Sequence, residues 1–229
     1  WSAGTTYAAG ARCTLASTRR TYQSLQAANL NHEPTANLAW WADVGASNQW
    51  AMFDGALGSV TQSAAGITVV LRPGVVSALA VMQVQAESVR VRMLDEPGGM
   101  VVYDRSETMN RAFIGDWYEW TTAPFEYQPE AIFQNLPMYA TCELEVSITA
   151  DTLNPAQCGE LVVGAAYTLG APQMGAKLGI TDYSRKVTDE WGNTTLVQRA
   201  FAKTLDLPLV LDAAQLSKTY GVLAGLRAT

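Results

Sequence analysis

The chain is short of the residues from which most catalytic and metal sites are built. Its 229 residues include one histidine, His32, and three cysteines, Cys13, Cys142 and Cys158. A single histidine argues against histidine-based metal sites and catalytic triads, and no two cysteines have the C-x-x-C spacing of zinc or redox sites. A Cys142–Cys158 bridge is possible, but a reduced pair is the default. We therefore expect no cofactor and no metal ion.

Charged residues are also scarce, at 16% of the chain, and they leave a net charge of −6. No lysine and arginine cluster extends beyond Arg19-Arg20, so the sequence lacks the basic face that nucleic acid requires. No apolar run approaches the length needed to cross a bilayer, and no signal peptide is visible. The expected partners therefore include no nucleic acid, and no membrane insertion is expected.

Enzyme motifs are missing as well. The sequence has no G-x-x-x-x-G-K-[ST] loop and no Gly-x-Ser-x-Gly elbow. Glycoside hydrolysis needs two carboxylates across a cleft, and the candidate acidic pairs fall on turns or on the exposed side of an expected strand. These pairs are Asp95/Glu96, Glu143/Glu145 and Asp189/Glu190. We expect the protein not to be an enzyme and assign no catalytic residue.

Aromatic residues, in contrast, are concentrated in the first 45 positions, among turn residues. A small domain has too little core to hide every ring, so a flat exposed surface is expected there. The order of these residues resembles the carbohydrate-binding modules of the chitin-binding type 3 kind. The residues that carry the resemblance are Trp1, Tyr7, Gly10, Tyr22, His32, Pro34, Trp40 and Trp41.

This resemblance implies that residues 1–46 form a small β module whose sugar-facing rings are Tyr7, Trp40 and Trp41. A pyranose can lay its axial C–H bonds on an aromatic ring while polar groups orient its hydroxyls. Neighbouring strand residues point to opposite faces, so at most one of the two tryptophans is expected to face a sugar. Any of these rings could equally belong to the miniature core. His32 is expected to hydrogen-bond within its own turn rather than to act in catalysis.

The sequence pattern of residues 47–165 predicts an antiparallel β-sandwich. Apolar and polar residues alternate in Ser88-Val-Arg-Val-Arg-Met93, and Leu144, Val146 and Ile148 are expected to share one face of their strand. The stretch 71–82 followed by the alternating strand resembles galactose-binding-like jelly rolls. The expected strands span 67–71, 88–93, 99–103, 116–122, 131–133, 142–149 and 161–169.

Residues 166–229 predict a hairpin and a helix used in assembly. The strand-like segments 177–186 and 196–205 flank the turn residues 189–194. Asp212 can cap a helix over 213–226. Its apolar stripe is expected to pack on a core in the ordinary way. The stripe consists of Leu216, Tyr220, Leu223 and Leu226.

The full order of motifs resembles a family of bacteriophage tail proteins. The motifs are W-S-x-x-T-T-Y-x-x-G from Trp1, N-x-W-A-M-F-D from Asn48, L-R-P-G from Leu71, V-Y-D from Val102, D-W-Y-E from Asp116 and D-Y-S-R-K-x-T-D-E-x-G-N from Asp182. The resemblance implies a structural virion component in the tail tip or baseplate region. It also implies a homo-oligomer with other tail proteins as partners and a module turned towards host glycans. The alternative is the accessory carbohydrate-binding part of a secreted polysaccharide hydrolase.

Overall fold

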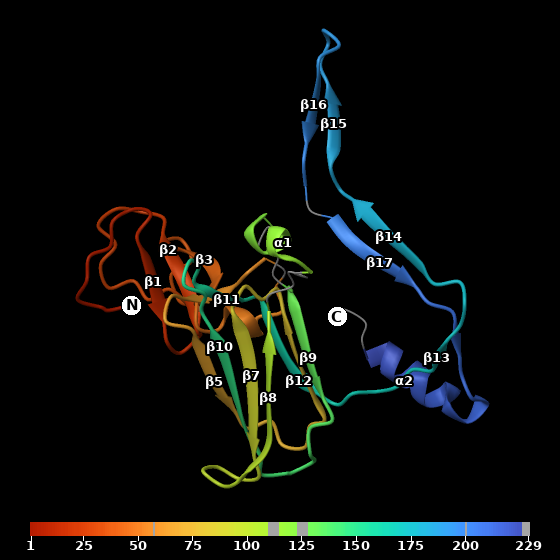
Figure 1. Cartoon of the computed structure of the whole chain (residues 1–229). Helices are drawn as coiled ribbons and strands as arrows, with labels where there is room; N and C mark the ends of the chain where they lie inside the picture. Colours follow the sequence, from red (N-terminus) through yellow and green to blue (C-terminus); the bar gives the residue numbers. More distant parts are fainter. Residues whose placement is uncertain (57, 110–114, 123–127, 200, 226–229) are drawn as a thin grey trace. The chain divides into compact units, whose positions relative to one another are not determined.

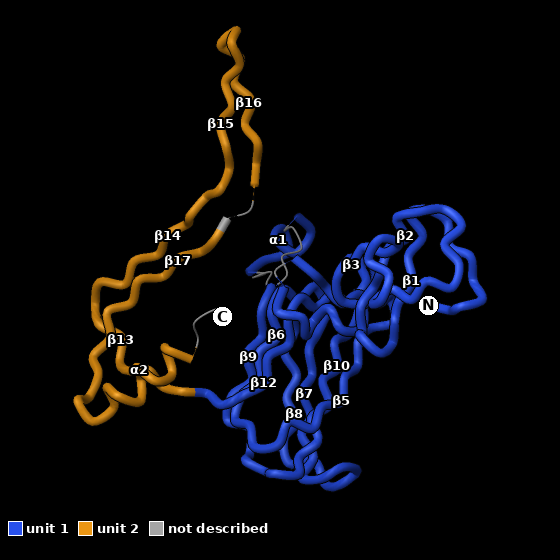
Figure 2. The backbone as a smooth tube through the Cα atoms, turned by 180° about the vertical axis from the view of Figure 1, so that it is seen from behind, with its two compact units in different colours: residues 1–166 blue, residues 167–229 orange. Residues whose placement is uncertain are grey.

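The computed structural model describes residues 1–56, 58–109, 115–122, 128–199 and 201–225 (Figure 1). Most of the regular structure is β-strand in antiparallel sheets, with a helix near the carboxyl end. The mainly β fold expected from the sequence is therefore confirmed. The chain divides into two compact units, residues 1–166 and 167–229 (Figure 2).

The first 46 residues form a three-stranded antiparallel sheet with a core of its own. The strands follow one another in the order β1 (Arg12–Leu15), β2 (Arg20–Ser24) and β3 (Trp41–Ala46). Cys13 on β1 pairs with Tyr22 on β2, and both side chains are buried together with Trp41. A separate cluster of this kind is what a small β module needs in order to hold its shape.

The rest of the first unit is a sandwich of two main antiparallel sheets. One sheet has the order β5 (Ile67–Leu71), β10 (Glu143–Thr149), β7 (Ser88–Leu94) and β8 (Val101–Thr108). The other has the order β12 (Glu160–Gly164), β6 (Ala78–Met82) and β9 (Glu130–Gln134). A short pair, β4 (Thr61–Ser63) with β11 (Ala156–Cys158), and the 3-10 turn η1 (Ala51–Phe53) complete it.

The sandwich core is built by alternate residues of the facing strands. On β10, Leu144, Val146 and Ile148 are buried, as the alternation predicts. Val146 pairs with Val69 on one side and with Val91 on the other. Because successive strand residues point to opposite faces, this register sends every second side chain of the sheet into the core.

Residues 116–122, expected to be a strand, form the helix α1 (Trp117–Thr122) instead. Asp116 Oδ1 accepts a hydrogen bond from the Glu119 amide at 2.8 Å, and Glu119 Oε2 accepts one from the Gly115 amide at 2.7 Å. This reciprocal arrangement is a variant of the capping box, which satisfies free amides at a helix start. The D-x-x-E spacing signals it, but the aromatic content of the segment favoured a strand.

The expected strand 161–169 also ends early, at Gly164. Gly164 pairs with Ala78, the first residue of β6, and beyond this pair the Ala166 amide donates to the Ser77 hydroxyl instead of to a strand carbonyl. A strand without a neighbour has no ladder to continue.

The second unit consists of a long two-part hairpin, a short strand pair and a helix. Its inner part pairs β14 (Lys177–Asp182) with β17 (Phe201–Asp206), and its outer part pairs β15 (Arg185–Thr188) with β16 (Thr194–Val197). The short pair is β13 (Ala171–Pro172) with β18 (Leu209–Val210). The expected hairpin is therefore confirmed, although each arm is two strands rather than one.

The tip of the hairpin is closed by Asp189, as the turn residues predict. Its carboxylate accepts hydrogen bonds from the amides of Trp191 and Asn193 at 3.0 and 2.7 Å. A further hydrogen bond, from the Asn193 side chain, lowers the pKa of Asp189. Gly192 has φ +82°, which only glycine adopts readily, so the turn residues fit their positions.

The helix α2 (Leu216–Gly225) follows a 3-10 turn, η2 (Ala213–Gln215). Asp212 caps that turn, since its carboxylate accepts from the Ala214 amide at 3.3 Å. The expected packing of the apolar stripe is wrong, because Leu216, Tyr220 and Leu223 are 46%, 68% and 48% exposed. Leu226 lies outside the described residues.

All three cysteines are free and buried. The Cys142 Sγ lies 3.1 Å from the Gly74 carbonyl oxygen. Burial raises the pKa of the Cys158 thiol to about 11. Burial also raises the pKa of the Cys13 and Cys142 thiols, so all three are poor nucleophiles at neutral pH and act as small apolar side chains of the two cores.

Candidate functional site

Trp41, one of the three predicted sugar-facing residues, lies inside the N-terminal module. Its side chain is 1% exposed, and its indole N–H donates to the His32 carbonyl at 2.8 Å. The Tyr7 ring meets it edge-on, with centroids 5.0 Å apart. A sugar cannot reach this ring, so the assignment of Trp41 to a binding surface is corrected: Trp41 is the centre of the miniature core.

Trp40 is partly buried against that core and stacks on His32. The two rings are nearly parallel, at 11°, with centroids 4.0 Å apart. Buried Asn29 holds the histidine, because its Oδ1 lies 3.0 Å from His32 Nδ1. The Asn29 amide nitrogen donates to Ser24 Oγ at 2.9 Å, which leaves Oδ1 as the acceptor and Nδ1 as the donor. As expected, His32 therefore forms its hydrogen bond within its own loop.

Tyr7, the third predicted residue, is also only partly buried. Its hydroxyl accepts a hydrogen bond from the Ser2 amide at 2.9 Å. Its backbone forms a bridge with Asn29, with N–H to O distances of 2.9 and 3.1 Å in the two directions. The structure thus places Tyr7 and Trp40 around one buried asparagine. Their role in binding sugar stays a prediction.

The most exposed aromatic cluster of the first unit lies elsewhere, on helix α1. Trp117, Tyr118 and Trp120 are 82%, 75% and 63% exposed. From the sequence, D-W-Y-E was identified only as a family motif on an expected strand, and the exposure of its rings was not predicted. The signal that could have found them is the capping spacing, because a helix brings residues three apart to one side.

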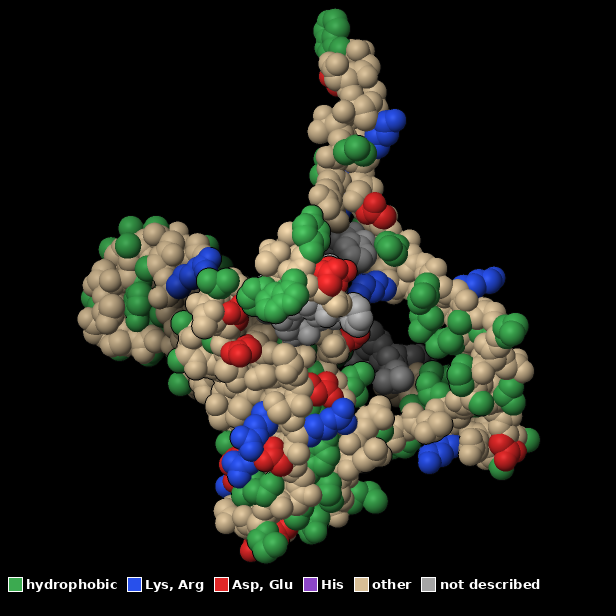
Figure 3. Space-filling model, viewed as in Figure 1, with side chains coloured by type: hydrophobic (Ala, Val, Ile, Leu, Met, Phe, Trp, Pro, Cys, Tyr) green, Lys and Arg blue, Asp and Glu red, His purple; other side chains and the backbone are tan. Residues whose placement is uncertain are grey.

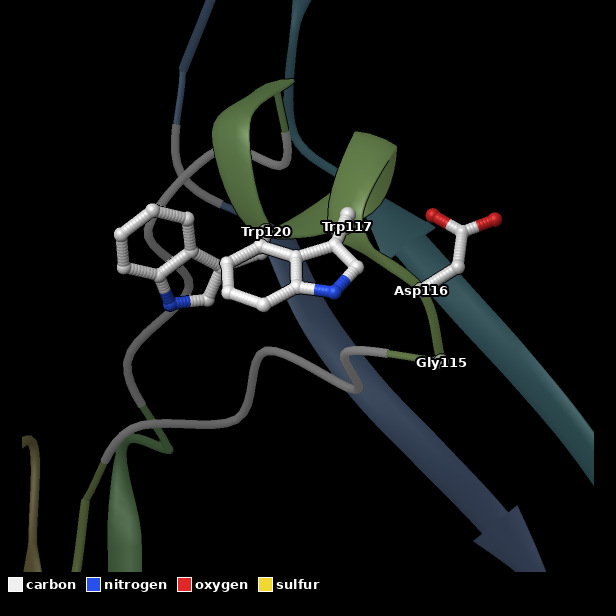
Figure 4. A pocket seen from close by; sticks show the side chains of 4 residues that line it. All are labelled: Gly115, Asp116, Trp117 and Trp120. Atoms are coloured by element: carbon white, nitrogen blue, oxygen red, sulfur yellow. The ribbon is translucent and has the colours of Figure 1, made fainter.

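The two α1 tryptophans border an open hollow of about 510 Å³, lined also by Gly115 and Asp116 (Figure 4). Their ring centroids lie 5.8 Å apart at 77°. Figure 4 shows the Asp116 carboxylate pointing away from both indoles. Among the described residues that line the hollow, the single acid is therefore turned away from the rings, and the two indoles suit stacking of an apolar surface.

A second hollow, of about 490 Å³, runs along the edge strand β5. All five β5 residues line this hollow. Because alternate side chains of a strand point to opposite faces, a hollow lined by all five must follow the edge of the strand. Its other wall includes Trp50 and Phe53, and the Arg19 guanidinium carbon lies 3.8 Å from the centroid of the Trp50 ring. The groove is lined mainly by apolar side chains and contains no acidic residue among those described.

The outer face of the sheet that contains β7 is covered by ion pairs (Figure 3). Arg90 binds Asp104 through two hydrogen bonds of 2.8 and 2.6 Å, and this bond lowers the pKa of Asp104. Arg92 reaches Glu145 at 2.7 Å. These carboxylates are paired with arginines rather than with one another, so this face has the character of a solvated surface.

The second unit exposes apolar residues along its whole length. Within the described part of 167–229, Thr219 is the only buried residue. Trp191 at the hairpin tip is 87% exposed and Leu178 on β14 is 87% exposed. Most of the apolar side chains that the structure describes in this unit are therefore exposed.

Among the residues that the structure describes, no group of three or more histidine, cysteine, aspartate or glutamate side chains could hold a metal ion. No described helix is both long and apolar enough to cross a membrane. Comparison of the chain with protein-family models, curated proteins and solved structures finds no match.

Proposed function

We propose that this chain is a structural component of a bacteriophage tail, in the tip or baseplate region. Residues 167–229 would join it to further copies and to other tail proteins, and the N-terminal module would face the host envelope as a carbohydrate-binding-like surface. The order of sequence motifs suggests this assignment. The single structural observation that supports it most is a second unit almost without a core.

The second unit cannot be stable as an ordinary domain. A two-stranded hairpin alone is marginal in water and needs further strands or a helix against an apolar face. Here the apolar side chains of both the hairpin and α2 are uncovered. A segment of this kind gains its stability by burying those side chains in an assembly, and symmetric oligomers are the usual solution.

The N-terminal module supports the other half of the proposal. Its core is separate from that of the sandwich, so the module keeps its form wherever the larger body is attached. Stacking on His32 and the buried Asn29 fix the orientation of Trp40 before any ligand arrives. A ring that is already ordered loses little freedom on binding, which favours affinity.

Particles purified by density gradient should contain this chain as a fixed component. Quantitative mass spectrometry would give its copy number relative to a capsid protein, and cryo-electron microscopy would place it in the tail. The lysate depleted of particles is the control. A chain absent from particles would contradict the proposal, and one secreted as part of a polysaccharide hydrolase would establish the alternative.

Trp40→Ala should weaken glycan binding by about 1–3 kcal/mol, the size of a lost stacking contact. A glycan array would identify the ligand, and isothermal titration of that glycan would measure the change. Trp117→Ala is the matched control, because it removes an exposed indole from α1 instead. Circular dichroism would check that both variants are folded.

Equal binding by wild type, Trp40→Ala and Tyr7→Ala would reject the module as a sugar platform. If Trp117→Ala alone lost binding, the sugar surface would belong to α1. Neither result would affect the particle measurement, so attachment and tail membership are tested separately.

A further inference from the structure

The β14/β17 ribbon has one apolar and one polar face. Directly opposite residues of paired strands share a face, and Leu178 is opposite Leu205. Ile180 lies two residues further along β14, so it is on the same face. These three residues, called here the apolar face of the ribbon, are 87%, 57% and 70% exposed in the order named.

The opposite face of the ribbon contains small and polar residues. Gly179 is paired with Thr204, and Thr181 with Ala202. Lys177 and Asp206 form the remaining pair on this side. The ribbon is therefore amphipathic with the period of a half-buried strand, and its apolar face is the one that needs a cover.

We propose that the apolar face of the ribbon packs against the same face of a second copy of this chain. The inference rests on the assembly role proposed above, and it adds which surface makes the contact and which partner covers it. Identical apolar faces complement one another in an isologous contact. Sheets packed face to face in this way lie about 10 Å apart with their strands roughly aligned.

The charges on this face fit a copy of itself. Besides the three apolar residues it carries Lys203, which is opposite Ile180, and Asp182, two positions beyond Ile180. One positive and one negative charge leave the face without net charge. A strongly acidic or strongly basic partner would place like charge against one of them.

A two-fold axis along the ribbon places all these residues well. It lays β14 of one copy over β17 of the other, so that Leu178 meets Leu205 of the second copy. Lys203 then lies over Ile180 of the second copy and diagonally next to Asp182 of that copy, which is two residue pairs further along the ribbon. The leucine contact and the ion pair therefore each occur twice in the dimer, because the two-fold axis repeats every contact.

Sedimentation velocity of the full chain, with Ile180→Asp and its neighbour Thr181→Asp, tests the contact. Wild type and Thr181→Asp should associate, because Thr181 is on the polar face. Ile180→Asp should raise the dissociation constant by roughly 100-fold or more, since two apolar side chains are lost per contact and two charges enter it. A monomeric wild type, or equal behaviour of both variants, would overturn the proposal.

Cross-linking checks the geometry without introducing a charge into the contact. Leu178→Cys and Leu205→Cys chains, differently tagged and mixed, should be joined by a short bismaleimide, because the native cysteines are buried. Thr181→Cys and Thr204→Cys chains are the control on the polar face. Preferential joining of the control pair would overturn the arrangement.

The ribbon contact and the proposed tail role can fail independently, and the experiments distinguish the two failures. Association that depends on Ile180 in a chain absent from particles would support this contact and contradict the tail role. If the chain were present in particles but its ribbons did not cross-link there, the tail role would be supported and the ribbon contact contradicted.

Discussion

Trp41→Ala should lower the stability of the N-terminal module by about 3–5 kcal/mol, the range for removing a large aromatic side chain from a core. Trp41 is 1% exposed and is the largest side chain in a core that has only two other buried apolar members. Its indole N–H also satisfies the His32 carbonyl. A core this small cannot collapse around the resulting cavity. We therefore expect the module to unfold while the sandwich stays folded.

Hydrogen exchange followed by mass spectrometry would measure this loss strand by strand. Amides of β1, β2 and β3 should lose protection in Trp41→Ala, while those of β7 and β10 keep it. Trp40→Ala is the matched control, because its ring lies at the edge of the same core and should cost much less. Similar losses in the two variants would mean that the module does not depend on Trp41 as its centre.

Phe133→Ala should lower the stability of the sandwich by a similar amount, about 3–5 kcal/mol. Phe133 is fully buried on β9, where it is paired with Leu79 on β6. Its removal takes apolar contacts from the core and leaves a cavity that the flanking strands cannot close. The transition midpoint in urea, followed by circular dichroism, should fall while its slope is unchanged.

Ile132→Ala provides the control from the adjacent position. Ile132 is on the same strand but points outwards and is 52% exposed, so its loss should change stability by well under 1 kcal/mol in the isolated chain. An equal effect of the two substitutions would contradict the described register. A larger effect of Ile132→Ala only at high protein concentration would indicate that this outer face is also covered in an assembly.

Strands with strict alternation were the part of the fold most open to prediction. In β10, the apolar positions 144, 146 and 148 are buried because they face the core. The expectation that Glu143 is exposed was wrong, because its side chain is buried and accepts hydrogen bonds from Arg72. The turn at Asp189 and the cap at Asp212 were equally local, since each depends on hydrogen bonds between near neighbours.

Helix α1 and the stripe on α2 show where local patterns were insufficient. At α1, β-favouring aromatic residues outweighed a capping signal, and the capping signal was the correct one. At α2, helical spacing correctly predicted an apolar stripe, but spacing cannot tell whether the chain itself provides a surface to cover it. The same limit applied to Trp40 and Trp41, where alternation required opposite directions without saying which ring faces inwards.

The sequence by itself determined the mainly β class, the positions of most strands and the hairpin turn, because alternation and turn chemistry act over a few residues. Only the tertiary structure decided that Trp41 is the centre of a core, that the α1 rings are exposed and that the second unit has almost no interior. Burial depends on which distant segments meet, and no short stretch of sequence contains that information.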